Sequence, residues 1–138
     1  MRRGLELHVR VLFVDDNEMN RKVVKAMLEP ADVVMAEAES AEIGLSMIDA
    51  GEFDLILMDL RMPGMDGLAA IRQMRGRTDH KAGLPIIVVT ADTGSDVRGQ
   101  ALAAGANDLL HKPVHMQSLF DAIGRVMTAT SNRGARLA

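Results

Sequence analysis

The sequence predicts a single α/β domain built on a five-stranded, doubly wound parallel sheet. Five short apolar runs recur along the 138 residues, and each is followed by a segment whose apolar residues have helical spacing. The runs are continuously apolar rather than alternating, which is typical of parallel strands that are covered by helices on both faces. With 48% apolar residues, the chain is long enough for one such core.

The first two strand and helix units come early in the chain. The first strand is expected at residues 9–14, a run of β-branched and apolar residues that stops at an acidic pair. The helix after it covers residues 19–28, where apolar residues recur at helical spacing and Pro30 closes the segment. Residues 33–36 form the second strand, and residues 43–48 mark a second helix that a glycine ends.

The third and fourth units continue the alternation. The third strand is the run 55–58, and a turn-rich loop separates it from a helical pattern at residues 68–74. A proline introduces the fourth strand at residues 86–89. The helix expected at residues 96–104 is weak, because a glycine in its interior costs about 1 kcal/mol relative to alanine. This helix is predicted to be the most mobile element.

The fifth unit ends the domain. It consists of a short strand at residues 109–111 and a helix at residues 116–127. The domain is therefore placed at residues 9–128. Residues 1–8 are expected to be an N-terminal extension, and residues 129–138 a flexible tail or the start of a linker.

The topology brings carboxylates together. Right-handed crossovers leave few arrangements for five such units, and the commonest is the flavodoxin-like (βα)5 sheet with strand order 2-1-3-4-5. Strands one and three are then neighbours at the point where the winding reverses. Asp15, Asp16 and Asp59 follow these two strands directly. We expect the three carboxylates to converge on the crevice where open parallel sheets bind ligands.

The composition excludes several classes of function. Against 19 Asp and Glu residues, the 16 Lys and Arg residues leave a formal net charge of −3 and no large basic surface for nucleic acid. The chain has no Cys, which removes disulfides, zinc knuckles, iron–sulfur ligation and thiol nucleophiles. No apolar stretch approaches the roughly 20 residues of a membrane span and no secretory signal is evident, so a cytoplasmic protein without membrane insertion is expected.

The acidic cluster predicts a metal and a phosphoryl ligand. Three nearby carboxylates disfavour one another's ionisation, and a hard divalent cation relieves that cost. Oxygen ligands suit Mg²⁺ or Mn²⁺ better than zinc or copper, and Mg²⁺ is commonly shared between carboxylates and phosphate oxygens. Thr90 and Lys112, which end strands four and five, offer a hydroxyl and an ammonium group to phosphoryl oxygens. An aspartate at the centre can itself accept the phosphoryl group as an acyl phosphate.

These residues together resemble the receiver domains of two-component response regulators. The markers, in chain order, are Asp15-Asp16, the block 57–67, Thr90-Ala91 and Lys112-Pro113. The resemblance covers residues 9–128, nearly the whole chain. The segment 14–22 is most similar to receivers that are attached to hybrid histidine kinases.

The resemblance implies a phosphoacceptor site. Asp59 would accept the phosphoryl group from a phosphohistidine on a histidine kinase or a histidine phosphotransfer protein. Asp16, Asp59 and the backbone carbonyl of Arg61 would bind Mg²⁺ directly, and Asp15 would act largely through water.

The resemblance also implies phosphoryl-binding and switch residues, which are Thr90, Ala91 and Lys112. Lys112 would pair with Asp59 and then with the phosphoryl group, toward which Thr90 would turn. The Lys112–Pro113 peptide bond is expected to be cis. The response would be a population shift of the loop and helix after strand four. A downstream protein would bind the face made by helix four, strand five and helix five.

One position departs from the family pattern. Receiver domains usually carry a Tyr or Phe three positions before the Lys as a partner of the switch Thr, and here that position is Leu109. A Leu cannot exchange an exposed hydroxyl for a buried ring. We therefore predict a smaller conformational response, or one that runs through the loop at residues 91–95.

Two further residues are expected at the mouth of the site. Arg61 and Asp92 each lie two positions beyond a key residue, Asp59 and Thr90 respectively. Their opposite charges are expected to pair there. The hypothesis is that this pair hinders the approach of hydrolytic water and so lengthens the lifetime of the acyl phosphate.

The chain is accordingly predicted to be a phosphoacceptor signalling domain of a phosphorelay that catalyses only its own phosphorylation and dephosphorylation. One alternative is a pseudo-receiver that acts as an interaction module, and Leu109 is the residue that favours it. The other is an aspartate-nucleophile phosphatase, which would need its nucleophile after strand one and a second Asp two positions on. Position 17 is Asn, and Asp59 follows strand three.

Overall fold

The computed structural model describes residues 9–137, with side chains to residue 129, so the extension expected at residues 1–8 lies outside the described part. Strands and helices alternate along the chain as the apolar pattern predicted. Three of the described strands form where β-branched and apolar residues run together. The strands are β2 (Arg10–Val14), β3 (Val34–Ala38), β4 (Leu55–Met58), β5 (Ile86–Thr90) and β6 (Asp108–His111).

A helix follows each strand. The helices are α1 (Glu18–Leu28), α2 (Ala41–Ala50), α3 (Gly67–Arg75), α4 (Val97–Ala104) and α5 (Met116–Leu137), with short 3-10 turns at Glu29–Ala31 and His80–Gly83. Three of them begin at a polar side chain that accepts a hydrogen bond from the first turn: Asn17, Ser40 and Asp66 cap α1, α2 and α3. The Asp96 side chain makes no such bond to α4. This agrees with the weak helix expected there.

The five described strands form one parallel sheet in the order β3-β2-β4-β5-β6. In chain order this is 2-1-3-4-5, so the predicted doubly wound topology is confirmed. In the register of the two central strands, Val14 lies beside Met58. The residues that follow these two, at the carboxyl ends of β2 and β4, therefore come to the same point of the sheet edge.

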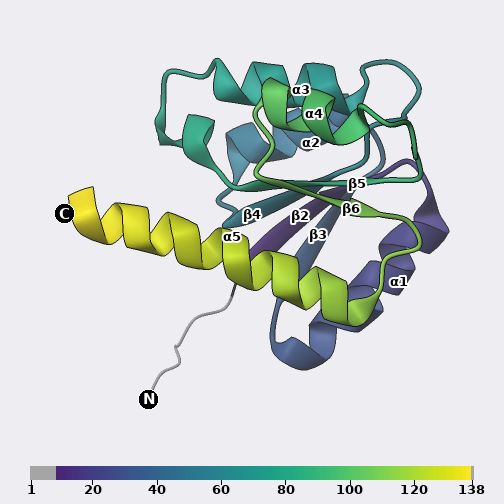
Figure 1. Cartoon of the computed structure of the whole chain (residues 1–138), viewed down its shortest axis with the longest axis horizontal. Helices are drawn as coiled ribbons and strands as arrows, with labels where there is room; N and C mark the ends of the chain where they lie inside the picture. Colours follow the sequence, from purple (N-terminus) through teal and green to yellow (C-terminus); the bar gives the residue numbers. More distant parts are fainter. Residues whose placement is uncertain (1–8, 138) are drawn as a thin grey trace.

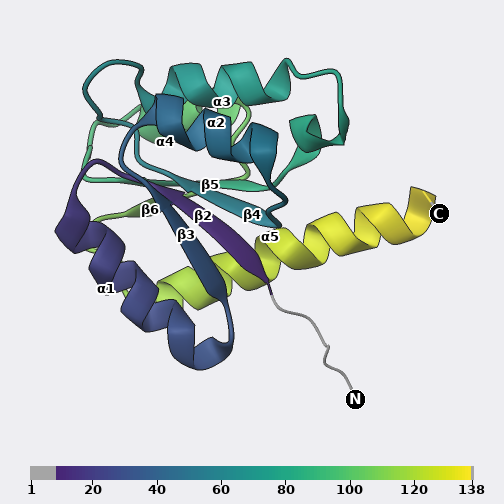
Figure 2. The same ribbon diagram turned by 180° about the vertical axis from the view of Figure 1, so that it is seen from behind.

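The sheet is the middle of three layers. Figure 1 shows α2, α3 and α4 over one face and α1 and α5 over the other, and Figure 2 shows the same layers from behind. Alternate residues of each strand enter the two cores. Leu12, Ile56 and Ile86 pack on the α2–α4 side, whereas Phe13, Leu57 and Ile87 pack on the α1–α5 side. All six side chains are fully buried.

The last helix is longer than the sequence predicted. A tail or linker was expected from residue 129, but α5 continues to Leu137, and its end extends beyond the sheet in Figures 1 and 2. Adding a residue to an existing helix is far easier than nucleating one, because each added residue brings its own hydrogen bond. The glycine and the polar residues of this segment therefore do not end the helix where their low propensities suggested.

None of the helices in the described part of the chain is both long and apolar enough to cross a membrane.

Candidate functional site

The carboxyl ends of β2 and β4 place three carboxylates together. The Asp59 N–H donates to the Val14 carbonyl at 2.9 Å, which fixes Asp59 beside the end of β2. Asp15 and Asp59 are buried and Asp16 is exposed. One carboxylate oxygen from each of the three lies within 4.8 Å of the other two. The convergence predicted from the strand order is therefore present.

The Asp15 carboxylate is occupied by protein donors. Its Oδ1 accepts the Asn17 backbone N–H at 2.8 Å. Its Oδ2 lies 2.9 Å from the Lys112 ammonium and 3.4 Å from the Asn20 side-chain amide. Burial without partners would be costly for this charge, and these contacts offset the cost. They leave Asp16 and Asp59 as the members with more freedom to bind a ligand.

Asp59 is an unusually basic carboxylate. Burial raises its pKa, and the neighbouring charge of Asp15 raises it further. The Lys112 ammonium and a hydrogen bond from the Arg61 backbone act in the opposite direction without cancelling these effects. The resulting pKa is about 6, so Asp59 is mostly ionised at neutral pH and more nucleophilic than an ordinary aspartate.

Lys112 reaches the cluster from the end of β6. Its ammonium lies 3.5 Å from Asp59 Oδ1, somewhat farther than from Asp15. The Lys112 N–H donates to the Thr90 carbonyl at 2.8 Å, which ties the loop after β6 to the end of β5. The Lys112–Pro113 peptide bond is cis.

The residues expected to act in the switch lie at the end of β5, in the loop after it and in β6. Thr90 is fully buried, and its hydroxyl accepts the Asp92 N–H at 3.0 Å. Ala91 is exposed in the loop between these two residues. Leu109, which occupies the position of the usual aromatic residue, is buried in the core beneath α4 and is 6% exposed.

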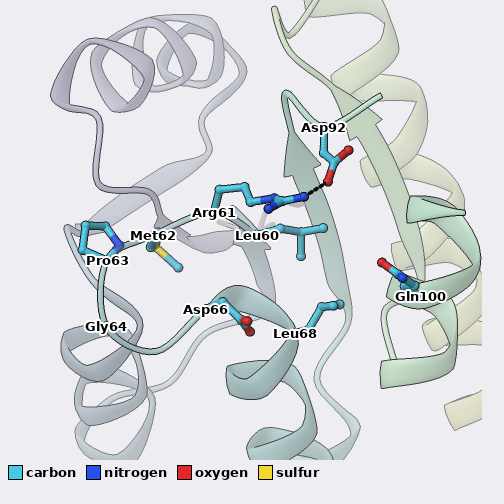
Figure 3. Close-up of a pocket in the computed structure, with 9 residues that line it drawn as sticks. All are labelled: Leu60, Arg61, Met62, Pro63, Gly64, Asp66, Leu68, Asp92 and Gln100. Carbon is cyan, nitrogen blue, oxygen red and sulfur yellow. Dashed lines mark hydrogen bonds and ion pairs between the residues drawn. The ribbon is translucent and has the colours of Figure 1, made fainter. Parts of the chain in front are cut away.

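Arg61 and Asp92 form the ion pair that was predicted. The Arg61 guanidinium contacts Asp92 Oδ2, and this contact lowers the pKa of Asp92. Figure 3 shows the pair at one side of a hollow of about 620 Å³ between the loop after β4 and helix α4. The hollow is also lined by Met62, Asp66 and Gln100.

The loop after β4 is closed by a glycine that no larger residue could replace without movement. A Cβ atom at Gly67 would lie 2.2 Å from the Asp59 carbonyl oxygen and 2.9 Å from the Leu60 Cα. The Gly67 N–H donates to the Leu60 carbonyl at 3.0 Å. Asp66 caps α3 by accepting the Ala69 N–H at 2.9 Å. The close approach of Gly67 to Asp59 and Leu60 helps to fix the backbone of the segment that carries Asp59 and Arg61.

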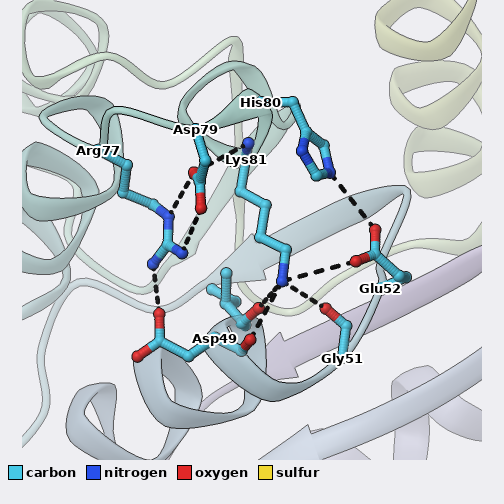
Figure 4. A network of polar contacts seen from close by, with 8 residues as sticks. Asp49, Gly51, Glu52, Arg77, Asp79, His80 and Lys81 are labelled. Atoms are coloured by element: carbon cyan, nitrogen blue, oxygen red, sulfur yellow. Dashed lines mark hydrogen bonds and ion pairs between the residues drawn. The ribbon is translucent and has the colours of Figure 1, made fainter.

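A second polar network lies at the opposite edge of the sheet, at the end of α2 (Figure 4). The buried Lys81 ammonium donates to the carbonyls of Ile48, Asp49 and Gly51 at 2.7, 3.2 and 3.0 Å. It therefore satisfies carbonyls at the helix end that lack partners within the helix. This network is structural and lies away from the three carboxylates.

Several residues around the acidic loop have structural roles that the sequence did not indicate. Asn17 and Asn20 contact Asp15, and Arg21 bonds to both the Asp15 carbonyl and Glu37. Asn17 could have been found as a helix cap, because it lies two residues before the first apolar residue of a pattern with helical spacing. The Arg21 contacts join residues that are distant in the chain and carry no local signal.

Comparison with known proteins identifies the family. The family model of the response regulator receiver domain matches residues 11–124. The chain belongs to the response regulator receiver domains. Receiver domains are the signalling domains of two-component systems, so the predicted function class is confirmed.

Curated relatives of this receiver domain include much longer sensor kinases. It is 36% identical over 120 residues to hybrid signal transduction histidine kinase G of Dictyostelium discoideum, and 33% identical over 116 residues to the sensor protein GacS of Pseudomonas syringae pv. syringae. The matches cover 85% and 83% of this chain but only 4% and 13% of the relatives. The predicted likeness to receivers of hybrid kinases is confirmed.

Solved receiver structures have the same fold. The receiver domain of a sensor histidine kinase from Pseudomonas aeruginosa PAO1, solved with a magnesium ion coordinated in its active site cleft, is 30% identical, with a TM-score of 0.80 over 88% of this chain and 99% of its own. A response regulator receiver domain protein from Methanospirillum hungatei JF-1 is 26% identical, with a TM-score of 0.83 over 92% of this chain and 99% of its own.

The donor set of this receiver domain fits a hard divalent cation. All three acidic side chains offer oxygen atoms, and hard cations of this kind bind oxygen. Asp16 is exposed, so a cation can reach the site from solvent. Burial raises the pKa of Asp59, and repulsion from Asp15 raises it further; a cation would relieve that repulsion.

Proposed function

We propose that this receiver domain accepts a phosphoryl group from a phosphohistidine onto Asp59, with Mg²⁺ bound, and signals through protein–protein contacts. The observation that carries the proposal is the environment of Asp59. It is a buried but ionisable carboxylate, 3.5 Å from the Lys112 ammonium and in one cluster with Asp15 and Asp16.

The transfer is a single displacement at phosphorus. A carboxylate oxygen of Asp59 forms a bond to the phosphorus atom while the bond from phosphorus to the imidazole nitrogen breaks. The electron pair of that bond stays on the nitrogen. The donor histidine must be supplied by a histidine kinase or a histidine phosphotransfer protein, because no pattern around the four His residues suggests a phosphoryl carrier. The chain acts on no other substrate in this proposal.

The metal would be held by Asp16, Asp59 and the backbone carbonyl of Arg61, with Asp15 acting through water. The contacts of Asp15 support its indirect role, since its oxygens already accept from Asn17 and Lys112. When bound, Mg²⁺ would supply positive charge for the phosphoryl oxygens. Mn²⁺ fits the same oxygen ligands.

Residues at the ends of β5 and β6 would contact the phosphoryl group and respond to its presence. Lys112 is close enough to Asp59 to contact a phosphoryl group there. Thr90 would exchange its contact with the Asp92 N–H for a phosphoryl oxygen, and Ala91 would offer its backbone N–H. A move of Thr90 would pull on the loop that leads into α4, whose first turn lacks a side-chain cap. The downstream partner would bind the face of α4, β6 and α5.

Intact-protein mass tests the function. The chain is incubated with acetyl phosphate or a phosphohistidine donor, with and without Mg²⁺, and compared with Asp59→Asn. The chain has no Trp, so mass replaces tryptophan fluorescence as the readout. We expect a gain of one phosphoryl group that requires both Mg²⁺ and Asp59. If no donor produced a gain, the pseudo-receiver would be the better description.

The phosphatase alternative is disfavoured by the site. Such an enzyme places its nucleophile after the first strand of the sheet and a second acid two positions later. Here Asn17 occupies that second position and caps α1, while Asp59 follows β4.

The cytoplasmic location predicted from the sequence stays a prediction.

A further inference from the structure

Arg21 connects the acidic loop to the neighbouring strand. From α1, its Nη1 donates to the Asp15 backbone carbonyl at 2.7 Å and its Nε donates to Glu37 Oε1 at 3.0 Å. Glu37 lies in β3, the edge strand beside β2. The Arg21 side chain is only 13% exposed, so most of this contact is shielded from water.

The contact fixes the peptide group that leads to Asp16. The Asp15 N–H donates to the Ala38 carbonyl at 3.0 Å, and its carbonyl accepts from Arg21. Both backbone groups of Asp15 are thus tied to β3, one directly and one through the guanidinium. Over residues 9–129, no hydrogen bond or ion pair holds the Asp16 carboxylate itself. The direction of that carboxylate therefore depends on its backbone.

The fork of an arginine suits this arrangement. Its planar guanidinium directs separate N–H groups at the Asp15 carbonyl and at Glu37, whereas a lysine ammonium is a point charge without such fixed directions. Glu37 is a stable anchor, because hydrogen bonds from Arg21 and Lys25 outweigh the effect of burial and lower its pKa. It therefore stays ionised at neutral pH.

We infer that Arg21 is a positioning residue of the cation site: braced by Glu37, it holds the Asp15–Asp16 peptide so that Asp16 faces the bound cation. The inference rests on the proposed function, because it concerns the same cation. A positive charge close to a cation site would by itself weaken binding. The role assigned to Arg21 is therefore geometric and opposes its own electrostatic effect.

That opposition gives the test a clear sign. Arg21→Met removes the guanidinium and one positive charge, and Mg²⁺ affinity of the full chain is measured by titration calorimetry. If charge alone mattered, the variant would bind Mg²⁺ more tightly. We expect it to bind about tenfold more weakly, the lower end of the effect of losing a group that orients a metal ligand. Arg21→Lys keeps the charge but loses the fork, so it should weaken binding too.

Lys22→Met is the matched control. Lys22 is the next residue in the chain, is exposed, and pairs with Glu18 on the helix surface. Its loss removes the same charge without touching Asp15. We expect Mg²⁺ affinity to stay within about twofold of that of the native chain, in keeping with the small effect of exposed pairs. Denaturant unfolding without metal, run on every variant, separates a loss of fold from a loss of the site.

Phosphorylation kinetics give an independent readout. With acetyl phosphate, the Mg²⁺ concentration for half-maximal rate should rise in Arg21→Met, while the rate at saturating Mg²⁺ should stay close to that of the native chain. If Arg21→Met fails to fold, Glu37→Gln tests the same brace against Glu39→Gln, which removes equal charge from an exposed side chain nearby. The Glu37 variant should then bind Mg²⁺ more weakly than the Glu39 variant.

The outcomes separate the inference from the proposed function. If Arg21→Met binds Mg²⁺ as tightly as Lys22→Met or more tightly, the positioning role is wrong even though the site works. If the native chain binds no Mg²⁺ and gains no phosphoryl group, the proposed function fails and the inference fails with it. Weaker binding in Arg21→Met and Arg21→Lys, with Lys22→Met unchanged, supports both.

Discussion

Arg61 and Asp92 form an ion pair that joins the loop after β4, which carries Asp59, the proposed phosphoacceptor, to the loop that follows Thr90 at the end of β5. Arg61 is largely exposed, while Asp92 is only 21% exposed and also accepts the Gly94 N–H at 2.9 Å. The pair therefore connects an exposed arginine side chain to a carboxylate that a backbone N–H also holds.

The position of this pair predicts an effect on the lifetime of the acyl phosphate. We predict that the pair covers part of the approach from solvent to Asp59, so removing either side chain should let water reach the phosphorus more readily. We expect Arg61→Ala and Asp92→Ala to speed dephosphorylation by up to about fivefold, which corresponds to the roughly 1 kcal/mol upper limit of an exposed pair. The measurement is the decay of the phosphorylated mass after the donor is removed.

Arg72→Ala is the control, because it removes an exposed arginine from α3 that has no contact with Asp92. Its decay rate should match that of the native chain. Unchanged or slower decay in both Arg61→Ala and Asp92→Ala would show that the pair does not shield the site.

Most of the fold and of the acidic site could be predicted from the sequence. The apolar runs and the helical spacings are local patterns, and they locate the strands and helices from which the topology follows. The strand order follows from right-handed crossovers between five strand and helix units, and it makes the first and third strands neighbours. Asp15, Asp16 and Asp59 converge because they directly follow these two strands. The Arg61–Asp92 pair was predictable for the same reason, since each residue stands two positions beyond a strand-end residue. The resemblance to receiver domains then supplied the chemistry.

Contacts between distant side chains were not predictable in this way. Arg21 and Glu37 are 16 residues apart and meet only because α1 packs against the edge of β3. Lys81 completes the end of α2 from more than 30 residues away. The end of α5 was misjudged because weak propensities of single residues do not stop a helix that packing has already started.

Leu109 predicts a muted response to phosphorylation. It is buried beneath α4 and has no hydroxyl to move between solvent and core. We expect Leu109→Tyr to enlarge the phosphorylation-dependent change in amide hydrogen exchange over residues 94–111. Leu110→Tyr is the matched control, because the next residue in β6 packs on the opposite face of the sheet.

The Leu109 prediction has a direct counter-result. If the change in exchange over residues 94–111 were the same in Leu109→Tyr and in the native chain, the missing aromatic residue would not limit the switch. The coupling would then run through the loop at residues 91–95, where Asp92 already links Thr90 and Arg61.

The raised pKa of Asp59 predicts how stability depends on pH without metal. In the folded chain Asp59 loses its proton at a pKa of about 6, whereas in the unfolded chain it does so near the ordinary aspartate pKa of 3.8. Between these values the folded state binds more protons, so the contribution of this group to stability falls as pH rises through that range. Asp59→Asn should therefore be more stable than the native chain at pH 7, by about 1–2 kcal/mol.

The measurement is denaturant unfolding of both proteins from pH 4 to pH 8. The advantage of Asp59→Asn should shrink toward pH 4, where the native carboxyl is protonated in the folded state. Adding Mg²⁺ should also reduce the advantage at pH 7, because a cation that binds only the folded native chain stabilises it. An advantage that is equal at all pH values would mean that ionisation of Asp59 is not its cause.

The tight packing at Gly67 predicts that a larger residue there destabilises the loop after β4. A Cβ atom at this position would lie only 2.2 Å from the Asp59 carbonyl oxygen, so the backbone at Asp59 and Leu60 or at residue 67 must shift. Alanine normally favours a helix start by up to about 1 kcal/mol over glycine, but overpacking of this kind typically costs about 1–3 kcal/mol. We expect Gly67→Ala to be destabilised in denaturant unfolding and slower to accept a phosphoryl group, since the Asp59 backbone moves.

Gly124→Ala is the opposite case within the same molecule. Gly124 is exposed in α5, and an added Cβ atom would meet nothing within 4 Å. This substitution should raise the free energy of unfolding by about 0.5–1 kcal/mol and leave phosphorylation unchanged. If Gly67→Ala unfolded at the same denaturant concentration as the native chain, the loop could accommodate a Cβ atom without loss of stability. The rigidity assigned to the backbone of Asp59 would then be wrong.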